Sequence, residues 1–204
     1  MIETLQINKE LGKKHFPKGC EYCGRDVVFT SGEAISYDSA SNNIYCCEAF
    51  LERENGIPIC NTYVYAHSVS KNGSVKDTPI GRLSNNELRV LHRLANKLFY
   101  SLWKDKRINE IEDYVVGFYD EDDLETRYGR VLSCDDLNTR YTIQDLHNNE
   151  IVERFKSDVE TVSLRAKAVA WLAVQLDTDY SGAIISWMDK ETTIRTIQIL
   201  NEVL

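Results

Sequence analysis

Six cysteines are the residues whose type and spacing point most directly to chemistry. Cys20 and Cys23 are separated by two residues and followed by Gly24, a sequence typical of a tight turn that directs two thiolates at one metal ion. Cys47 and Cys60 are the candidates for the second pair, because a strand and a loop separate them from that turn. The four cysteines predict a tetrahedral Zn2+ site. Four thiolates fill the zinc shell and leave no position for a catalytic water, so the predicted site is structural.

The cysteine pattern leaves two alternatives and one ambiguity. A Cys-x-x-Cys pair is also found in redox proteins, but there it precedes a helix, whereas here it precedes a Val-Val-Phe strand. Free cysteines are the other alternative. Cys46 lies next to Cys47, and neighbouring residues of a strand face opposite sides of a sheet. Only one of the two therefore faces the metal, and the spacing does not decide which.

No motif of a catalytic site accompanies the cysteines. The sequence contains no Gly-rich phosphate loop, no Gly-x-Ser-x-Gly and no His-Glu-x-x-His, so an enzymatic activity has no support. The acidic run at 120–125 lacks the glycine and the final glutamate of a calcium loop and is expected to be solvated. Cys134 is expected to be a buried free thiol and His92 a surface histidine.

Short strands and three helices are predicted to position these groups. Strands are expected at 27–29, 43–45 and 63–65, and four or five more between 110 and 162. A capping box led by Ser84 predicts an amphipathic helix over 85–105, whose apolar set includes Leu94. A nearly apolar, buried helix is expected at 163–176 with Ser163 as its cap. A last helix at 190–203 would be capped by Asp189, with Ile194, Ile197 and Leu200 inward.

These elements predict an α+β fold with an N-terminal zinc ribbon, a helical body and a small antiparallel β insertion. The expected parts are an N-terminal arm at 1–18, the zinc ribbon at 19–83, the helical body at 84–108 and 163–204, and an acidic β insertion at 109–162. Within the insertion, the run from Tyr128 to Val162 resembles an SH3-like or Tudor-like barrel through its Gly-x-Val strand, Tyr-x-Ile strand and intervening polar turn.

The net charge of −8 is unevenly distributed. Residues 109–162 contain 15 acidic and 5 basic residues, whereas 84–108 contains 6 basic and 2 acidic residues. Overall acidity therefore does not exclude a nucleic-acid partner, although 109–162 is not expected to contact phosphates. The candidate nucleic-acid-binding residues are Lys13, Lys14 and Lys18 before the ribbon, and Arg89, Arg93 and Lys97 on one face of the first long helix.

Two classes of function are consistent with this pattern. The first is a nucleic-acid-binding or regulatory protein, in which the ribbon tyrosines Tyr22, Tyr45, Tyr63 and Tyr65 stack on bases. The alternative is that these rings form the small core of the ribbon. The second class is a protein–protein interaction module, such as a phage-type factor acting on a host protein through the acidic insertion. The absence of a signal peptide or a spanning apolar run predicts a cytoplasmic protein, in the host cytoplasm if it is viral.

Several motifs carry a family resemblance. They are Cys20-Glu-Tyr-Cys23-Gly, Asn43-Ile44-Tyr45-x-Cys47, Cys60-Asn-Thr-Tyr63-Val64-x-x-His67, Pro79-x-Gly81-x-Leu83, Asn86-Glu87-Leu88-Arg89 and Trp171-Leu172-Ala173. In order and spacing over 20–105 and 164–202, the chain resembles a small bacterial and phage family, a zinc-finger-containing domain of unknown function. The resemblance implies that Cys47 is the third ligand, that Cys46 replaces an apolar residue, and that 106–163 is an insertion.

Overall fold

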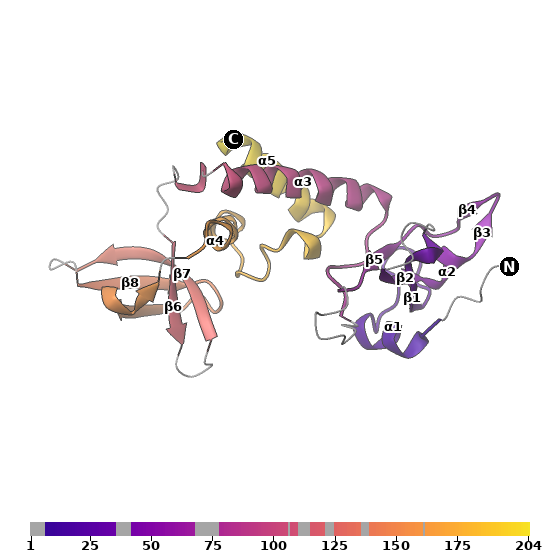
Figure 1. The fold of residues 1–204 in the computed structure, drawn as a ribbon, viewed down its shortest axis with the longest axis horizontal. Coiled ribbons are helices and arrows are strands. Elements are labelled where there is room, and N and C mark those ends of the chain that lie inside the picture. The colour runs from indigo at the N-terminus through magenta and orange to yellow at the C-terminus, as the bar shows by residue number, and fades with distance from the viewer. Residues whose placement is uncertain are drawn as a thin grey trace. The chain divides into compact units, whose positions relative to one another are not determined.

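The structure is a computed structural model that describes residues 7–35, 42–67, 78–105, 107–109, 115–120, 125–135, 139–160 and 162–204. The chain divides into two compact units, Met1–Val90 and Leu91–Leu204, called here the N-terminal and C-terminal units. Helices and antiparallel sheets occur together, which confirms the α+β class (Figure 1). The acidic run predicted to be a solvated loop lies largely outside the described residues.

A three-stranded antiparallel sheet forms the centre of the N-terminal unit. Its strands, in spatial order, are β1 (Val27–Ser31), β2 (Asn43–Cys47) and β5 (Tyr63–Tyr65), and a short 3-10 turn, η1 (Gly32–Ala34), follows β1. Alternate residues of β2 enter different clusters. Tyr45 and Cys47 pack with Cys20 and Cys60, whereas Ile44 and Cys46 pack with Phe50. Each face of the sheet therefore has its own small core.

A short helix, α1 (Lys9–His15), packs on β1. The Asn8 side chain caps it by accepting a hydrogen bond from the Leu11 amide at 3.1 Å. Gly12 permits the close packing, because a Cβ at this position would lie 1.8 Å from the carbonyl oxygen of Val27. Residues 9–15, which fall in the predicted arm, thus contribute to the N-terminal unit.

The segment between Cys47 and Cys60 contains a helical turn followed by a hairpin. The elements are α2 (Glu48–Leu51), β3 (Arg53–Glu54) and β4 (Ile57–Pro58). Asn55 and Gly56 join the two strands with φ values of 51° and 82°, the positive values that a tight hairpin turn needs. The segment is therefore ordered by its own turn chemistry.

The long helix α3 (Asn86–Lys104) lies where it was predicted, but the predicted cap was wrong. Asn85, not Ser84, accepts a hydrogen bond from the Leu88 amide, at 2.9 Å. Ser84 is buried and its backbone is paired with Tyr63, so its hydroxyl donates to the Arg82 carbonyl instead. Leu94 was also assigned wrongly to the apolar face, since 44% of its surface is exposed.

A five-stranded antiparallel sheet forms one part of the C-terminal unit. In spatial order its strands are β10 (Val159–Glu160), β6 (Val115–Asp120), β7 (Glu125–Cys134), β8 (Arg140–Asp145) and β9 (Ile151–Phe155), and the 3-10 turn η4 (Lys156–Asp158) precedes β10. Phe118 and Ile143 are buried in its core. Cys134 lies exposed at the end of β7, so the prediction of a buried thiol was wrong. Its sulfur contacts the Asp135 carboxylate at 3.9 Å instead of an apolar cluster.

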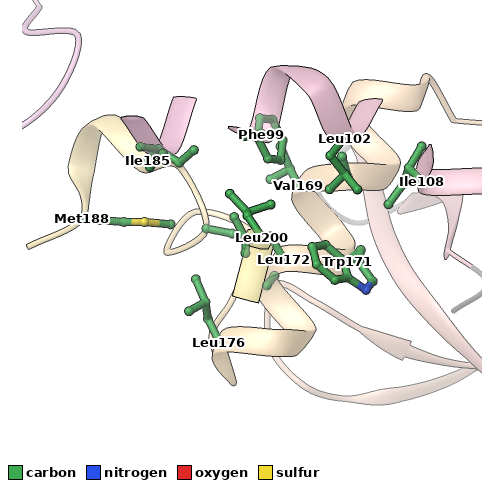
Figure 2. Close-up of a cluster of buried hydrophobic side chains, with 14 residues drawn as sticks. Phe99, Leu102, Ile108, Val169, Trp171, Leu172, Leu176, Ile185, Met188 and Leu200 are labelled. Carbon is green, nitrogen blue, oxygen red and sulfur yellow. The ribbon is translucent and has the colours of Figure 1, made fainter. Parts of the chain in front are cut away.

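Helices form the rest of this unit. They are the second half of α3, the 3-10 turns η3 (Arg107–Asn109) and η5 (Ile185–Trp187), α4 (Leu164–Leu176) and α5 (Lys190–Val203). α4 is apolar over most of its surface. Leu172 and Trp171 pack in the helical core (Figure 2), and Ala170 packs in the cluster with Val115 of the sheet. The predicted caps of α4 and α5 are confirmed, with Ser163 accepting from the Ala166 amide and Asp189 from the Thr192 amide.

Two assignments in the helical core were wrong. Ile194 of α5 is exposed, because the inward positions of the helix are taken by Thr193 and Thr196, whose hydroxyls donate to the Asp189 carbonyl and the Met188 sulfur. His92 is partly buried and donates from Nε2 to the Met188 carbonyl at 3.0 Å, so it is not a simple surface residue.

No helix in the described part of the chain combines the length and the apolar character needed to cross a membrane.

Candidate metal centre

Four cysteine sulfurs from three separate segments converge in the N-terminal unit. The sulfurs of Cys20, Cys23, Cys47 and Cys60 all lie within 4.8 Å of one another. The Cys20 and Cys60 sulfurs are 3.8 Å apart, and those of Cys23 and Cys47 are 3.3 Å apart. In a tetrahedral site with zinc–sulfur bonds of about 2.3 Å, sulfurs are about 3.8 Å apart. The cluster therefore has the size of a single Zn2+ site.

Backbone hydrogen bonds shape the turn that holds the first pair. The Cys20 amide donates to the Arg25 carbonyl and the Gly24 amide donates to the Cys20 carbonyl, both at 2.8 Å. Gly24 has a φ of 75°, which L side chains rarely adopt. Gly19 before the turn is constrained further, since at its φ of 72° a Cβ would lie 2.7 Å from the Arg25 carbonyl oxygen. The Cys-x-x-Cys sequence and both glycines together close this turn.

The second pair comes from the end of β2 and from the segment after the hairpin. The Cys47 amide donates to the Thr62 carbonyl at 3.0 Å, and the Cys60 amide donates to the Ala49 carbonyl at 3.3 Å. These two hydrogen bonds hold the segment that carries Cys47 beside the segment that carries Cys60. The Thr62 hydroxyl lies 3.2 Å from the Cys60 sulfur. A metal-bound thiolate only accepts hydrogen bonds, so this hydroxyl donates to it. The sequence carried no signal for this partner.

The alternation of side chains along β2 separates Cys46 from Cys47. Cys47 lies with the cluster, opposite Val27 of β1, while Cys46 is on the other face of the sheet with Val28 and Ile44. Burial alone raises the pKa of the Cys46 thiol to about 12. Cys46 thus serves as a small apolar side chain, and Cys47 completes the site.

The environment of the four sulfurs suits thiolates that a cation neutralises. Burial raises the pKa of Cys47 and of Cys60 when the thiols carry no metal. Burial also raises the pKa of Cys23, but hydrogen bonds from the Arg25 amide and the other cysteines outweigh it and lower the pKa overall. Three of the four residues are buried, and only Cys23 is exposed. A divalent cation offsets half of the charge of four thiolates, and Zn2+ is the ion that such sulfur-only sets bind.

Comparison with known families supports the same conclusion. The model of a zinc-finger-containing domain family matches residues 16–120, just over half of the 204-residue chain. The chain belongs to this family. The match of the zinc-finger-containing domain takes in all four cysteines, and with their grouping it is consistent with Zn2+ as the bound metal. It does not reach the second resembling block at 164–202. No curated protein and no solved structure matches the chain significantly.

The predicted nucleic-acid-binding residues lie in different settings. Lys13, Lys14 and Lys18 are exposed on or just after α1. Arg89 is held within the N-terminal unit, where it donates to the Asn61 carbonyl and side chain and to the Ser84 carbonyl. Its guanidinium also stacks 4.0 Å from the centre of the Tyr63 ring. Arg93 and Lys97 are exposed on α3.

Thiol reactivity gives a first test of these assignments. In the zinc-loaded protein we expect iodoacetamide at pH 8 to alkylate Cys134 and to spare Cys46, because Cys134 is exposed whereas Cys46 is buried with a pKa of about 12. Peptide mapping by mass spectrometry measures the modification at each site. Rapid labelling of Cys46 in the folded protein would contradict its place in the core, and Cys134→Ser should remove the fast-reacting thiol.

Proposed function

We propose that the protein binds single-stranded nucleic acid through its N-terminal unit, with zinc as a structural ion. The observation that carries the proposal is a group of three exposed lysines, Lys13, Lys14 and Lys18, for which the described residues offer no ion pair. Exposed, unpaired lysines close together attract phosphates without the cost of breaking an existing ion pair.

Several carboxylates of the same unit, unlike the three lysines, are held in ion pairs. Glu48 pairs with Lys9 and Glu52 pairs with Arg25, each at 2.7 Å, and Glu21 pairs with Arg82. These exposed pairs add little stability, but they neutralise three carboxylates of the unit. The three lysines have no such partner among the described residues.

Among the described aromatic side chains of this unit, Tyr22 is the one exposed enough to stack on a base. Tyr22 lies inside the Cys-x-x-Cys turn and 43% of its surface is exposed. Tyr45 is fully buried and packs against the rings of Phe16 and Phe29, while Tyr63 and Tyr65 are half-buried. Tyr22 is therefore the ring of this unit that we assign to base stacking, and Tyr45 belongs to the core.

Charge reversal tests the proposal. We expect the variant with Lys13→Glu, Lys14→Glu and Lys18→Glu to bind labelled single-stranded DNA or RNA at least tenfold more weakly at low salt. Each lost phosphate contact should reduce the slope of log K against log salt by about 0.7. Fluorescence anisotropy at several salt concentrations measures both quantities. Arg89 is left unchanged, because a charge reversal there would disturb the fold around Tyr63 and Asn61.

A control separates local contacts from net charge. Arg140→Glu on β8 with Lys156→Glu in η4 places two reversals in the C-terminal unit, whereas the three lysines belong to the N-terminal unit. This variant should retain the wild-type affinity and salt slope. Equal weakening by both sets would show that only overall charge matters, and unchanged binding by the lysine variant would reject the proposal.

A second candidate function is protein binding through the five-stranded sheet. The strand order, with β10 beside β6 after the turn η4, supports an SH3-like or Tudor-like arrangement of the acidic segment. The favouring observation is that β9 pairs only with β8 among the described strands and exposes 66% of Ile151 and 48% of Phe155. If a protein partner binds here, Ile151→Asp with Phe155→Asp should abolish its co-purification, whereas the lysine variant should retain it.

A further inference from the structure

The C-terminal unit contains a pocket with a volume of about 640 Å³. α3, the first turn of α4, β7 and the segment 180–186 contribute to its lining. The side chains that matter for the argument are Phe99, Tyr100, Trp103, Arg165, Tyr128 and Tyr180. A volume of this size accommodates one drug-sized or nucleotide-sized ligand.

Aromatic rings from α3, β7 and the segment 180–186 line this space. Tyr128 of β7 stacks on Tyr180, with ring centres 4.6 Å apart and planes inclined by 17°. Tyr100 and Trp103, on α3, form an edge-to-face pair with centres 5.1 Å apart, and 51% of the Tyr100 surface is exposed. Tyr180 also stacks on His147, with ring centres 5.9 Å apart, so Tyr100 is the half-exposed ring of this pocket that can stack on a flat π-system.

The charged side chain of the pocket indicates the charge of the ligand that it binds. Arg165 is the charged side chain among the described lining residues, and no described carboxylate lines the pocket. Arg165 forms no hydrogen bond or ion pair with the described part of the chain. It lies in the first turn of α4, where backbone amides also favour an anion. A cationic ligand such as a methylated lysine is therefore disfavoured.

On the exposed face of α3, cationic side chains flank the aromatic ring of Tyr100. Lys97, Tyr100 and Lys104 are spaced by three and four residues and so lie along one side of the helix. Both lysines are exposed and have no ion pair among the described residues. A strand whose base enters the pocket would have its flanking phosphates within reach of this row. Alternating bases and aromatic rings are typical of single-strand binding surfaces.

From these observations we infer that the pocket binds one unpaired base of a single-stranded nucleic acid, with Arg165 at its phosphate. The inference deepens the proposed function, since the ligand class is the same, but it places a second contact in the C-terminal unit. Base pairs in a duplex are closed to such a pocket, so the site confers a preference for single strands over duplexes.

The test uses the zinc-loaded full chain and fluorescein-labelled hexamers of deoxythymidine and deoxyadenosine, with a 16-base-pair duplex for comparison. Tyr100→Ala and Arg165→Ala should each weaken hexamer binding about tenfold and leave duplex binding unchanged. Both side chains are exposed, so neither substitution threatens the core. Hexamer binding should also quench tryptophan fluorescence, and Trp103→Phe should remove most of that quenching.

Matched controls are Phe155→Ala, an exposed aromatic outside the pocket, and Lys156→Ala, an exposed cation in the turn η4. Both should bind the hexamers as the wild type does. Loss of affinity in the lysine variant of the N-terminal unit, with normal binding by Tyr100→Ala and Arg165→Ala, would overturn the pocket inference and keep the proposed function. The reverse pattern would support the pocket and reject the lysine surface. No hexamer binding by the wild type at low salt would reject both.

Discussion

Removal of zinc is expected to unfold the N-terminal unit and leave the C-terminal unit folded. Cys20, Cys47 and Cys60 are themselves members of the buried cluster that packs Val27 and Tyr45, so metal site and core coincide. Structural zinc sites contribute about 10–16 kcal/mol, which matches or exceeds the whole stability of an ordinary domain, about 5–15 kcal/mol. The C-terminal unit has its own core around α4 and holds none of the four ligands.

Two-dimensional amide NMR during titration with a chelator measures this outcome for each unit separately. Signals from the N-terminal unit should collapse to the narrow range of unfolded chains, while those of α4 and α5 keep their positions. Because protons compete with zinc for the thiolates, and burial raises the pKa of Cys47 and Cys60, less chelator should be needed as the pH falls. Retention of a folded N-terminal unit without metal would contradict a structural role for zinc.

Adjacent substitutions provide the sharpest control. Cys47→Ser should lose the bound zinc, measured by native mass spectrometry, whereas Cys46→Ala should keep one zinc per chain. The two residues are neighbours in β2 and equally buried, so they differ only in the face of the sheet that they occupy. Zinc loss in Cys46→Ala with retention in Cys47→Ser would reverse the assignment of ligands.

The ligand set was predictable because its chemistry is local and its residues are rare. Cys20, Cys23 and Gly24 lie in one short turn, which needs two thiolates close together and a residue that tolerates a positive φ. Residue spacing did not choose between Cys46 and Cys47. The family resemblance implied Cys47, and the packing of the two faces of β2 agrees with it. Among the helix caps, too, those set by local sequence were predictable and those set by tertiary packing were not. Ser163 and Asp189 act as predicted, but Ser84 was drawn into a buried backbone pairing that only the tertiary structure reveals.

Features assembled from distant segments were beyond prediction from the sequence. Arg89 looked like one member of a solvated basic row, yet Asn61 and Tyr63 hold it inside the N-terminal unit. The aromatic pocket combines Tyr100 of α3 with Tyr128 of β7 and Tyr180, residues that carry no common motif. Helical periodicity located the rings on α3, but their convergence with a strand and a loop depends on how α4 packs against both the helices and the sheet.

Leu172→Ala is expected to destabilise the C-terminal unit by about 2–5 kcal/mol without loss of zinc. Leu172 is fully buried at the centre of α4, in the cluster that also holds Leu102 and Leu200 from the neighbouring helices (Figure 2). Truncation removes apolar contacts and leaves a cavity that close-packed helices fill only in part. Chemical denaturation followed by the fluorescence of Trp171, which is buried in the same cluster, measures the loss.

An exposed leucine of the same unit isolates the effect of burial. Leu132 lies on β7 with 47% of its surface exposed, so Leu132→Ala should change the free energy of unfolding by less than about 0.5 kcal/mol. The NMR signals of the zinc-bound unit should persist in Leu172→Ala at denaturant concentrations that unfold α4. Simultaneous loss of both sets of signals would show that the two units unfold together, in which case zinc would also stabilise the aromatic pocket.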